Sequence, residues 1–520
     1  MYQTLSFDMH ISKVKLFLTG VFILSFIIRF IGQPSYPACL HRDEVQWAYN
    51  SYSIAQTARD EWGDFMPLHF KYNGEYHVPL VMYFPAIVFK LFDPSDIGFR
   101  IPFIILGSLI PLLGYWFSYL IFKNIKLSSI FAILLAINPW GIMNSRASGE
   151  LSILSLFFGI LGFILLFNYL KKTQLKYLLL AFLCFITTYF SYIASRFDIP
   201  LLLILFTLIY WHKIPKRKIT LSVFICLIIF PYLLVALHPQ RFNGTNIIGK
   251  HLELMKKDVK YDVEIKTLIK SYAQTGKEIV FEFVDNYFDY LNPYYIFRNM
   301  GEYDRTNLDQ SGSLYTFEFI FVLIGIISFL STSNKKTRYF FIFWLLITPI
   351  VGALTYNYPD RPNSSRTVYF YFVISMFSAY GIWIIMNHLN NKGIKLPVYL
   401  LLFLIAFINI GFVWSNFYKY GNQTMAKARG CGYQKLFSYT EEIKSNFNNI
   451  YVGTLYDYPY VQFLWYTKYD PDLYHHFLEI TPPEKSVVLI HQEHPHDWTL
   501  DKYTYAHNSC LMQTDANGSV

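Results

Sequence analysis

Long apolar runs alternate with short polar connections along most of the chain. The first run, Leu16 to Ile31, is apolar except for Arg29, and its length approaches the roughly 20 residues that a helix needs to cross a bilayer. Similar runs follow at Gly98 to Phe122, Leu127 to Met143, Leu151 to Leu170, Tyr177 to Ala194, Phe197 to Trp211, Ile219 to Leu237, Leu314 to Leu330, Tyr339 to Leu354, Thr367 to Met386 and Leu396 to Tyr418. The pattern predicts an all-α polytopic membrane protein with about 11 transmembrane helices.

Residues 33–97 interrupt this pattern with a stretch that is rich in both charge and aromatic side chains. Within it, DEVQWAYNSYSIAQTA has helical spacing, and Asp43 is a candidate amino-terminal cap of that helix. The apolar segment Pro79 to Phe92 is too short to span and contains Pro85. We therefore predict an outward first loop over 33–97 that carries juxtamembrane helices.

Charge placement fixes the expected orientation. The connections KNIK, KKTQLK, HKIPKRK, NKKTR and NHLNNKGIK contain Lys and Arg but no Asp or Glu, as cytoplasmic connections do. Lys13 and Lys15 precede the first run in the same way. The amino terminus is therefore expected in the cytoplasm, and the acid-containing loops are expected on the extracytoplasmic side.

Two further outward segments are too long to be simple turns. The loop over 238–313 mixes charged and aromatic residues, so we expect it to be structured. The tail over 419–520 contains strand-like NNIYVG and SVVLI around a helical YPYVQFLWYTKY, which predicts a small α/β extracytoplasmic domain. We divide the chain into a transmembrane domain, 1–418, and this tail, and we expect chemistry that depends on Asp43 to survive removal of the tail.

Composition agrees with a membrane protein, since 54% of the residues are hydrophobic and 15% are charged. The net charge of +9 resides in the connections, so it indicates topology, and no nucleic acid partner is expected. The cysteines show no metal-binding spacing, and only a bridge between Cys431 and Cys510 is conceivable. The histidine-rich HQEHPHDW in the tail fits no metal site and stays unassigned.

Acidic and basic side chains gather at the predicted outer membrane edge. Asp43 and Glu44 follow the first span, and Glu150 begins a later one. Near the same edge lie Arg100, Arg146, Arg196 and Arg366. Such acids can be solvated, cap a helix, bind a cation or act as a base. A carboxylate near several cations suits a reaction in which a hydroxyl loses a proton and a phosphate departs.

The ordered motifs of the chain resemble a known family. They are HRDE with YNSYSI and RDEWG, FKYNGEYHVPL, FRIP, NPWGIMNSRASGE, NPYYIFRNMGEYDR with GSLY, PDRPNSSR, and YDYPYVQFLWYTKYDP. This order resembles the bacterial and archaeal branch of the protein O-mannosyltransferases, glycosyltransferase family 39 of the membrane-embedded C superfamily, which is related to aminoarabinose transferases of lipid A.

The resemblance implies an inverting transfer from a polyprenyl-phosphate sugar, with Asp43 as general base and Glu44 as its partner. It places Glu150 where the mannosyltransferases usually have Asp, for acceptor positioning or base tuning. It assigns Arg366 to the donor phosphate. Other candidate phosphate ligands are Arg146, Arg100 and Lys71, and weaker candidates for the acceptor or a metal are His77 and Glu75.

We therefore expect an integral membrane glycosyltransferase that uses an undecaprenyl- or dolichyl-phosphate sugar and a protein, lipid or glycan acceptor. A divalent cation, Mg²⁺ or Mn²⁺, is an open alternative for the site. One other function is a transporter or flippase of lipid-linked sugars, which the small number of charges inside the spans disfavours. Another is a membrane-anchored envelope assembly protein whose tail carries the function.

Overall fold

The computed structural model describes residues 2–72, 75–147, 152–237, 246–251, 265–299, 311–355, 363–389, 392–453, 459–480 and 498–506. The chain forms two compact units. The membrane unit comprises Met1–Ile31, Phe103–Arg146 and Glu150–Lys419. The loop-tail unit comprises Gly32–Pro102, Ala147–Gly149 and Tyr420–Val520, so the first loop and the tail belong together and do not form separate domains.

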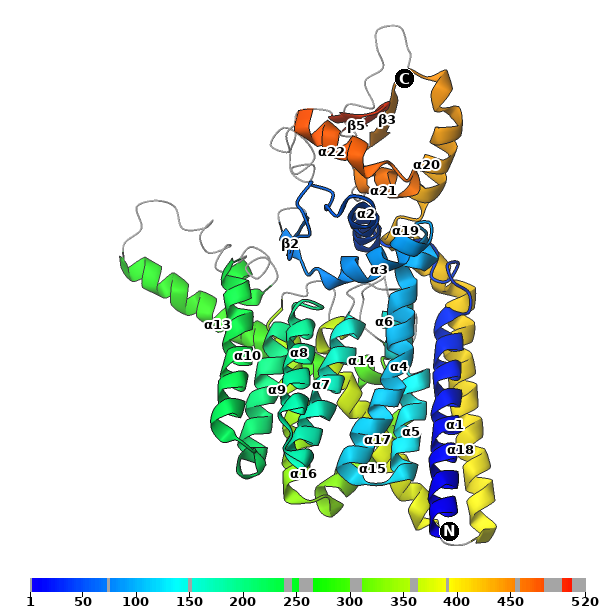
Figure 1. The fold of residues 1–520 in the computed structure, drawn as a ribbon, viewed down its shortest axis with the longest axis vertical. Helices are drawn as coiled ribbons and strands as arrows, with labels where there is room; N and C mark the ends of the chain where they lie inside the picture. The colour runs from blue at the N-terminus through cyan, green and yellow to red at the C-terminus, as the bar shows by residue number, and fades with distance from the viewer. Residues whose placement is uncertain are drawn as a thin grey trace. The chain divides into compact units, whose positions relative to one another are not determined.

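The membrane unit is a helical bundle (Figure 1). Its helices are α1 (Tyr2–Phe30), α4 (Asp96–Phe122, which begins in the loop-tail unit), α5 (Ile125–Ile137), α6 (Pro139–Arg146), α7 (Ser152–Lys172), α8 (Leu175–Tyr189), α9 (Ser195–Tyr210), α10 (Arg217–Leu237), α13 (Ile265–Leu291), α14 (Pro293–Phe297), α15 (Glu318–Thr332), α16 (Lys335–Ala353), α17 (Val368–His388) and α18 (Lys392–Asn416). Shorter turns are the 3₁₀ segments η1 (Trp211–Lys213) and η2 (Ser364–Thr367) and the π-helical η3 (Phe417–Gly421).

The bundle is built around α17, which packs against α5, α7, α15 and α16 and is buried from Val368 to Gly381. Small residues allow its closest approach to α15. A Cβ atom on Gly325 would meet the carbonyl of Phe377, and one on Gly381 would meet the carbonyl of Phe321. Because lipid supplies no hydrophobic drive between helices, close packing of this kind is a main source of their association.

In the described residues, six helices are long and apolar enough to cross a membrane, or seven if the bent pair α5 and α6 is one span. The chain is therefore a multi-pass membrane protein. The predicted number of about 11 is not confirmed, because α8 and α15 have only 15 residues each and α1 and α16 are not among the helices that meet both conditions.

A buried arginine explains how the bend of 47° between α5 and α6 is tolerated. Pro139 begins α6, and the break leaves carbonyls at the end of α5 without helical partners. Arg29 of α1 donates to two of them, Ala136 O at 2.9 Å and Leu135 O at 3.3 Å. The arginine that interrupts the first apolar run thus stabilises the bend.

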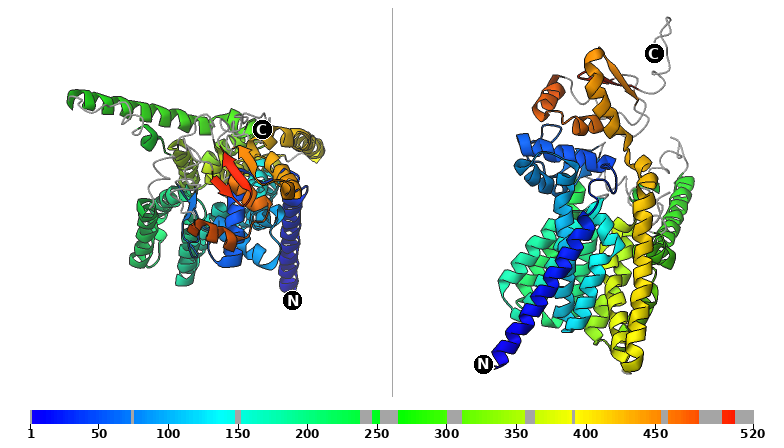
Figure 2. Two further views of the ribbon diagram at one scale, coloured as in Figure 1. Left: turned by 90° about the horizontal axis from the view of Figure 1, so that it is seen from above. Right: turned by 90° about the vertical axis from the view of Figure 1, so that its right-hand side faces the viewer.

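The described part of the long loop over 238–313 includes helices α13 and α14, in agreement with the expectation that it is structured. Part of the 27-residue α13 packs against α16 and α14. The rest of this helix extends away from the bundle (Figure 2). Residues 238–245, 252–264 and 300–310 of this loop lie outside the described part.

The loop-tail unit combines helices with two small sheets. Its first-loop elements are α2 (Arg42–Thr57), β1 (Phe70–Tyr72), β2 (Glu75–His77) and α3 (Leu80–Leu91), and its tail elements are α19 (Asn422–Arg429), α20 (Gly432–Ile443), η4 (Lys444–Asn446), β3 (Ile450–Gly453), α21 (Pro459–Tyr466), α22 (Pro471–Ile480), β4 (Trp498–Leu500) and β5 (Tyr503–Ala506). Strands β1 and β2 pair antiparallel, and the tail sheet has the order β3-β5-β4 with β3 parallel to β5. The predicted α2, the short α3 and the strand at NNIYVG are confirmed, while SVVLI lies outside the described residues.

Helix α2 is the centre of this unit. It packs against α3 of the first loop and against α21 and α22 of the tail, and nearly all of its length is buried. A polar sequence such as DEVQWAYNSYS becomes a core helix because two sets of neighbours cover it, one from each end of the chain.

Candidate functional site

The candidate site starts at the first turn of α2. His41 is its N-cap, since the His41 Nδ1 atom accepts a hydrogen bond from the Asp43 amide at 3.3 Å. Glu44 completes a capping box by accepting from the His41 amide at 2.9 Å. The alternative interpretation of Asp43 as the cap is therefore wrong, because the chain turns into the helix two residues earlier.

Asp43 is the second residue of α2, and its side chain is 17% exposed. Its carboxylate lies 3.3 Å from Arg42 Nε and 3.6 Å from His41 Nδ1. A partly exposed carboxylate on a helix, beside the guanidinium of Arg42, has the placement that a general base requires.

Glu44 has a different environment although it is the next residue. Its side chain is fully buried, with Arg100 Nε 3.1 Å from Oε1, and its Oε2 accepts from Arg100 and from Arg429. Burial alone would raise the pKa of Glu44, but the two guanidinium groups outweigh it and lower the pKa to about 2. Glu44 is therefore a buried anion held by two cations, a geometry that does not favour the predicted role of catalytic partner.

Arg100 uses all of its donors inside the protein. Besides Glu44 it donates to Gln33 Oε1 at 3.0 Å and to the carbonyls of Pro37 and Cys39 at 3.2 and 2.7 Å. Because a guanidinium has five N–H groups and each has an acceptor here, Arg100 has no donor left for a phosphate. This geometry does not favour the predicted phosphate contact.

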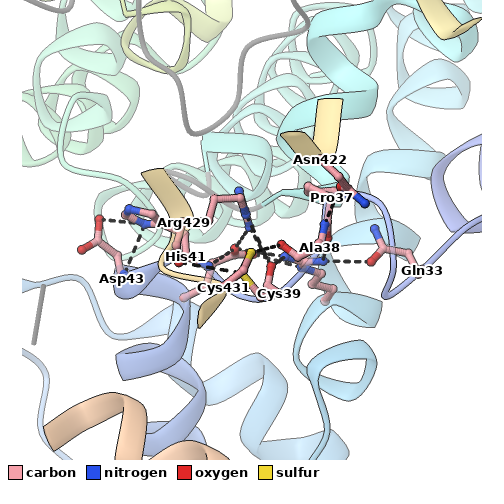
Figure 3. A network of polar contacts seen from close by, with 11 residues as sticks. Gln33, Pro37, Ala38, Cys39, His41, Asp43, Asn422, Arg429 and Cys431 are labelled. Atoms are coloured by element: carbon pink, nitrogen blue, oxygen red, sulfur yellow. Dashed lines mark hydrogen bonds and ion pairs between the residues drawn. A yellow bond between two sulfur atoms is a disulfide. The ribbon is translucent and has the colours of Figure 1, made fainter. Parts of the chain in front are cut away.

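A tail segment is attached to the loop that precedes α2 (Figure 3). Cys39 forms a disulfide with Cys431, so Cys431 is not available for the bridge to Cys510 that the sequence left conceivable. The two cysteines are 392 residues apart, and nothing in their local sequences pairs them. Asn422 adds two contacts, accepting from the Ala38 amide at 2.9 Å and donating to the Ser35 carbonyl at 2.7 Å.

Two buried acids near the end of α2 were not among the predicted site residues. Asp60 and Glu61 have no exposed surface, and Glu61 accepts from Gln46 Nε2 at 2.5 Å. Burial raises the pKa of Glu61 to about 8 and that of Asp60 to about 6. RDEWG was recognised only as part of a family pattern, and adjacent acids in a loop give no sign that they are buried.

Because the pKa values of Asp60 and Glu61 are raised in the folded protein, we expect its stability to depend on pH. Unfolded Glu61 loses its proton near pH 4.5, whereas the folded protein retains it to about pH 8. The free energy of unfolding should therefore decrease as the pH rises from 4.5 to about 8. The expected slope is at most about 1.4 kcal/mol per pH unit for this group. Glu61→Gln keeps an acceptor for Gln46 and should flatten the slope. Thermal midpoints of both proteins from pH 5 to 8 check this, and parallel curves would contradict it.

The hairpin formed by β1 and β2 carries the remaining first-loop candidates. His77 is buried, and its Nδ1 accepts from Trp47 Nε1 at 3.2 Å. Lys71 is half exposed, with its Nζ atom 3.5 Å from Asp64 Oδ2. The side chain of Glu75 lies outside the described residues. In the part of the chain that the structure describes, no group of three or more His, Cys, Asp or Glu side chains that could hold a metal ion comes together.

Arg146 and Arg366 belong to the membrane unit. Arg146 is buried, donates to the carbonyls of Ile28 and Arg29 at 2.8 and 3.1 Å, and lies over the ring of Phe417. It thereby caps the carboxyl end of α1, and this geometry favours a structural role over the predicted phosphate contact. Arg196 is also buried, and its Nε atom donates to the Tyr189 carbonyl at 3.2 Å.

Arg366 lies on η2 and is only partly buried. Its neighbour Ser365 donates to Asn144 Oδ1 at 3.2 Å, and Ser152 donates to the same oxygen at 3.1 Å. These bonds join η2 to α6 and α7 through a buried polar network. Glu150, the predicted acid beside this network in sequence, lies outside the described residues.

No family model and no curated protein sequence matches the chain. Among solved structures, the archaeal oligosaccharyltransferase AglB from Archaeoglobus fulgidus, in complex with an inhibitory peptide and a dolichol-phosphate, matches with a TM-score of 0.52 and 13% identity. The match covers 86% of this chain and 63% of AglB, so the chain spans less than two thirds of that protein. ArnT from Cupriavidus metallidurans, bound to undecaprenyl phosphate, matches with a TM-score of 0.51 and 10% identity over 92% of this chain and 89% of its own.

The chain has the GT-C fold. AglB and the aminoarabinose transferase ArnT share this fold, which confirms the family resemblance of the sequence at the level of the fold. This fold was expected from the resemblance that the order of short motifs shows over most of the chain.

Proposed function

We propose that this chain is an integral membrane glycosyltransferase that moves a sugar from a polyprenyl-phosphate carrier to an acceptor hydroxyl. The observation that carries the proposal is the shared GT-C fold, because AglB and ArnT are both transferases whose structures hold a polyprenyl phosphate. Asp43 supports it, since a partly exposed carboxylate stands at the start of a buried helix.

The reaction that we propose has Asp43 as general base. The acceptor oxygen attacks the anomeric carbon, the bond from that carbon to the phosphate oxygen breaks, and Asp43 takes the hydroxyl proton. Attack opposite the departing phosphate inverts the anomeric centre. An alcohol is a weak nucleophile until its proton has a destination, so the base is the group that the chemistry most needs.

For the donor phosphate we propose Arg366. A guanidinium matches phosphate oxygens with two parallel N–H groups and keeps its charge at every physiological pH. Partial burial beside a network of hydroxyl and amide groups distinguishes Arg366 from Arg100 and Arg146, whose side chains are fully buried. We propose no step through a metal ion.

We also propose that the amino terminus is cytoplasmic and that Asp43 and the tail are extracytoplasmic. The charge of the connections supports this orientation, since it leaves Lys216 and its basic neighbours in the cytoplasm. The acceptor is then a protein, lipid or glycan of the cell envelope.

The deciding experiment incubates the purified protein in lipid nanodiscs with a panel of undecaprenyl- and dolichyl-phosphate sugars and envelope acceptors. Mass spectrometry measures both the released polyprenyl phosphate and the glycosylated product. We expect the two to appear in equal amounts. A protein that moves intact donor between the leaflets of proteoliposomes and cleaves none of it would be a transporter.

Arg366 gives a separate prediction about donor binding. Arg366→Lys keeps the positive charge but loses the two parallel N–H groups of the guanidinium. The dissociation constant for polyprenyl phosphate should therefore rise by about tenfold, which corresponds to the loss of one charge-assisted hydrogen bond of about 1.4 kcal/mol. Arg338→Lys is a suitable control, because Arg338 lies in the first turn of α16 and donates to the Ser333 carbonyl. Titration of the purified variants with polyprenyl phosphate measures the effect, and equal affinity in Arg366→Lys and wild type would remove Arg366 from the donor site.

A further inference from the structure

The loop that leads into α2 is held by the tail through polar and covalent contacts that converge on two points. The first point is the carbonyl of Cys39, which accepts from Arg100 at 2.7 Å and from Arg429 at 3.3 Å. The second is the carboxylate of Glu44, which binds the same two guanidinium groups. Asp43 lies between Cys39 and Glu44 in sequence, so both points flank the proposed base.

The backbone at Cys39 explains why such support is needed. Its φ angle is +53°, a left-handed conformation that non-glycine residues seldom adopt and that persists only where the surroundings enforce it. The disulfide to Cys431 fixes the side chain of this residue, and Arg429, two positions earlier in the tail, fixes its carbonyl. The segment that holds Cys39 therefore lies nearly 400 residues later, since the two cysteines are 392 residues apart.

We propose that Arg429 is a positioning residue for Asp43, and that the tail segment from Asn422 to Cys431 belongs to the catalytic apparatus. This inference rests on the proposed role of Asp43 as base. It replaces the expectation that chemistry dependent on Asp43 survives removal of the tail. Arg429 acts through Glu44 and the Cys39 carbonyl, and it needs no contact with the substrate.

The central test is a double-mutant cycle between Arg429 and Asp43. Arg429→Gln should lower kcat by about 10²-fold, since a displacement of about 1 Å at a reacting group has that effect. In the Asp43→Asn background the same substitution should cause little further loss, because there is no base left to misplace. Arg429→Lys keeps the charge but loses the fork and should fall between Arg429→Gln and wild type. An equal fractional loss in both backgrounds would overturn the proposal.

Lys444→Gln is the matched control. Lys444 is a partly exposed cation of the same tail and pairs with Glu441 at 2.6 Å, away from the Cys39 loop in sequence and in its contacts. Its substitution removes one tail charge and should leave kcat unchanged.

Hydrogen exchange supplies a readout that does not require activity. In Arg429→Gln, and in the paired Cys39→Ser and Cys431→Ser variant, amides in the first turn of α2 should exchange at least tenfold faster, while β3 and β5 keep their protection. Loss of protection throughout β3 and β5 would show general unfolding, and unchanged exchange in α2 would show that the tail does not hold it. Either result overturns the proposal.

The two readouts also separate this inference from the proposed function. If the wild-type protein cleaves no polyprenyl-phosphate sugar, the proposed function fails, and the exchange data alone decide whether Arg429 holds α2. If the wild-type protein is active and Arg429→Gln retains its kcat, the function stands and the positioning role of Arg429 falls.

Discussion

Asp43→Asn should lower kcat by about 10²–10⁴-fold while the protein folds and binds polyprenyl phosphate as the wild type does. This is the range that a positioned general base contributes, equivalent to roughly 3–5 kcal/mol of the activation barrier. Asparagine has the shape of aspartate and cannot take a proton. His41 caps α2 and Glu44 completes the capping box, so the helix keeps its amino-terminal structure in the variant.

Asp472→Asn is the matched control for this substitution. Asp472 is the second residue of α22, as Asp43 is of α2, and it is exposed. Both substitutions remove a negative charge from a helix amino terminus, which costs about 0.3–1 kcal/mol. If Asp472→Asn retains turnover and Asp43→Asn does not, the loss reflects chemistry. Near wild-type turnover in Asp43→Asn, measured by released polyprenyl phosphate, would return Asp43 to a structural role.

Periodicity predicted most of what is local in this chain. Apolar runs, the amphipathic α2 and the strand β3 each have their signal within a few residues, and the structure contains them. The number of spans was predicted less well, because hydropathy identifies a helix but does not measure how far a 15-residue helix such as α8 reaches across a bilayer.

What the sequence could not supply is the pairing between distant segments. Cys39, Glu44 and Arg429 are each unremarkable in their own surroundings, and their contacts span nearly the whole chain. Because Arg429 belongs to the tail, far along the chain from the first loop, it was not among the arginines predicted at the membrane edge. The burial of Asp60 and Glu61 could not be predicted either, because adjacent acids in RDEWG give no sign that they are completely covered.

The adjacent acids Asp43 and Glu44 show most clearly that neighbours in sequence can have different environments in the fold. The family resemblance treated them as one catalytic pair, with Asp43 as general base and Glu44 as its partner. The structure separates them by environment, with Asp43 at the surface and Glu44 enclosed between Arg100 and Arg429. Substituting Asp43 should therefore affect turnover with little loss of stability, whereas substituting Glu44 should lower stability and affect turnover only through the position of Asp43.

Glu44→Gln should destabilise the loop-tail unit by about 3–5 kcal/mol, because it leaves two buried guanidinium groups facing each other without an anion. Wild-type stability should also fall as the pH drops from 4.5 towards about 2, since the lowered pKa of Glu44 means that the folded state favours its ionised form. Glu441→Gln, which removes a partly exposed partner of Lys444, should cost less than about 1 kcal/mol. Thermal unfolding in detergent at pH 7, followed by tryptophan fluorescence, compares the three proteins. If Glu44→Gln melts with the wild type, the two arginines do not depend on this carboxylate, and the tail must hold the first turn of α2 through the disulfide and its hydrogen bonds to residues 35–39.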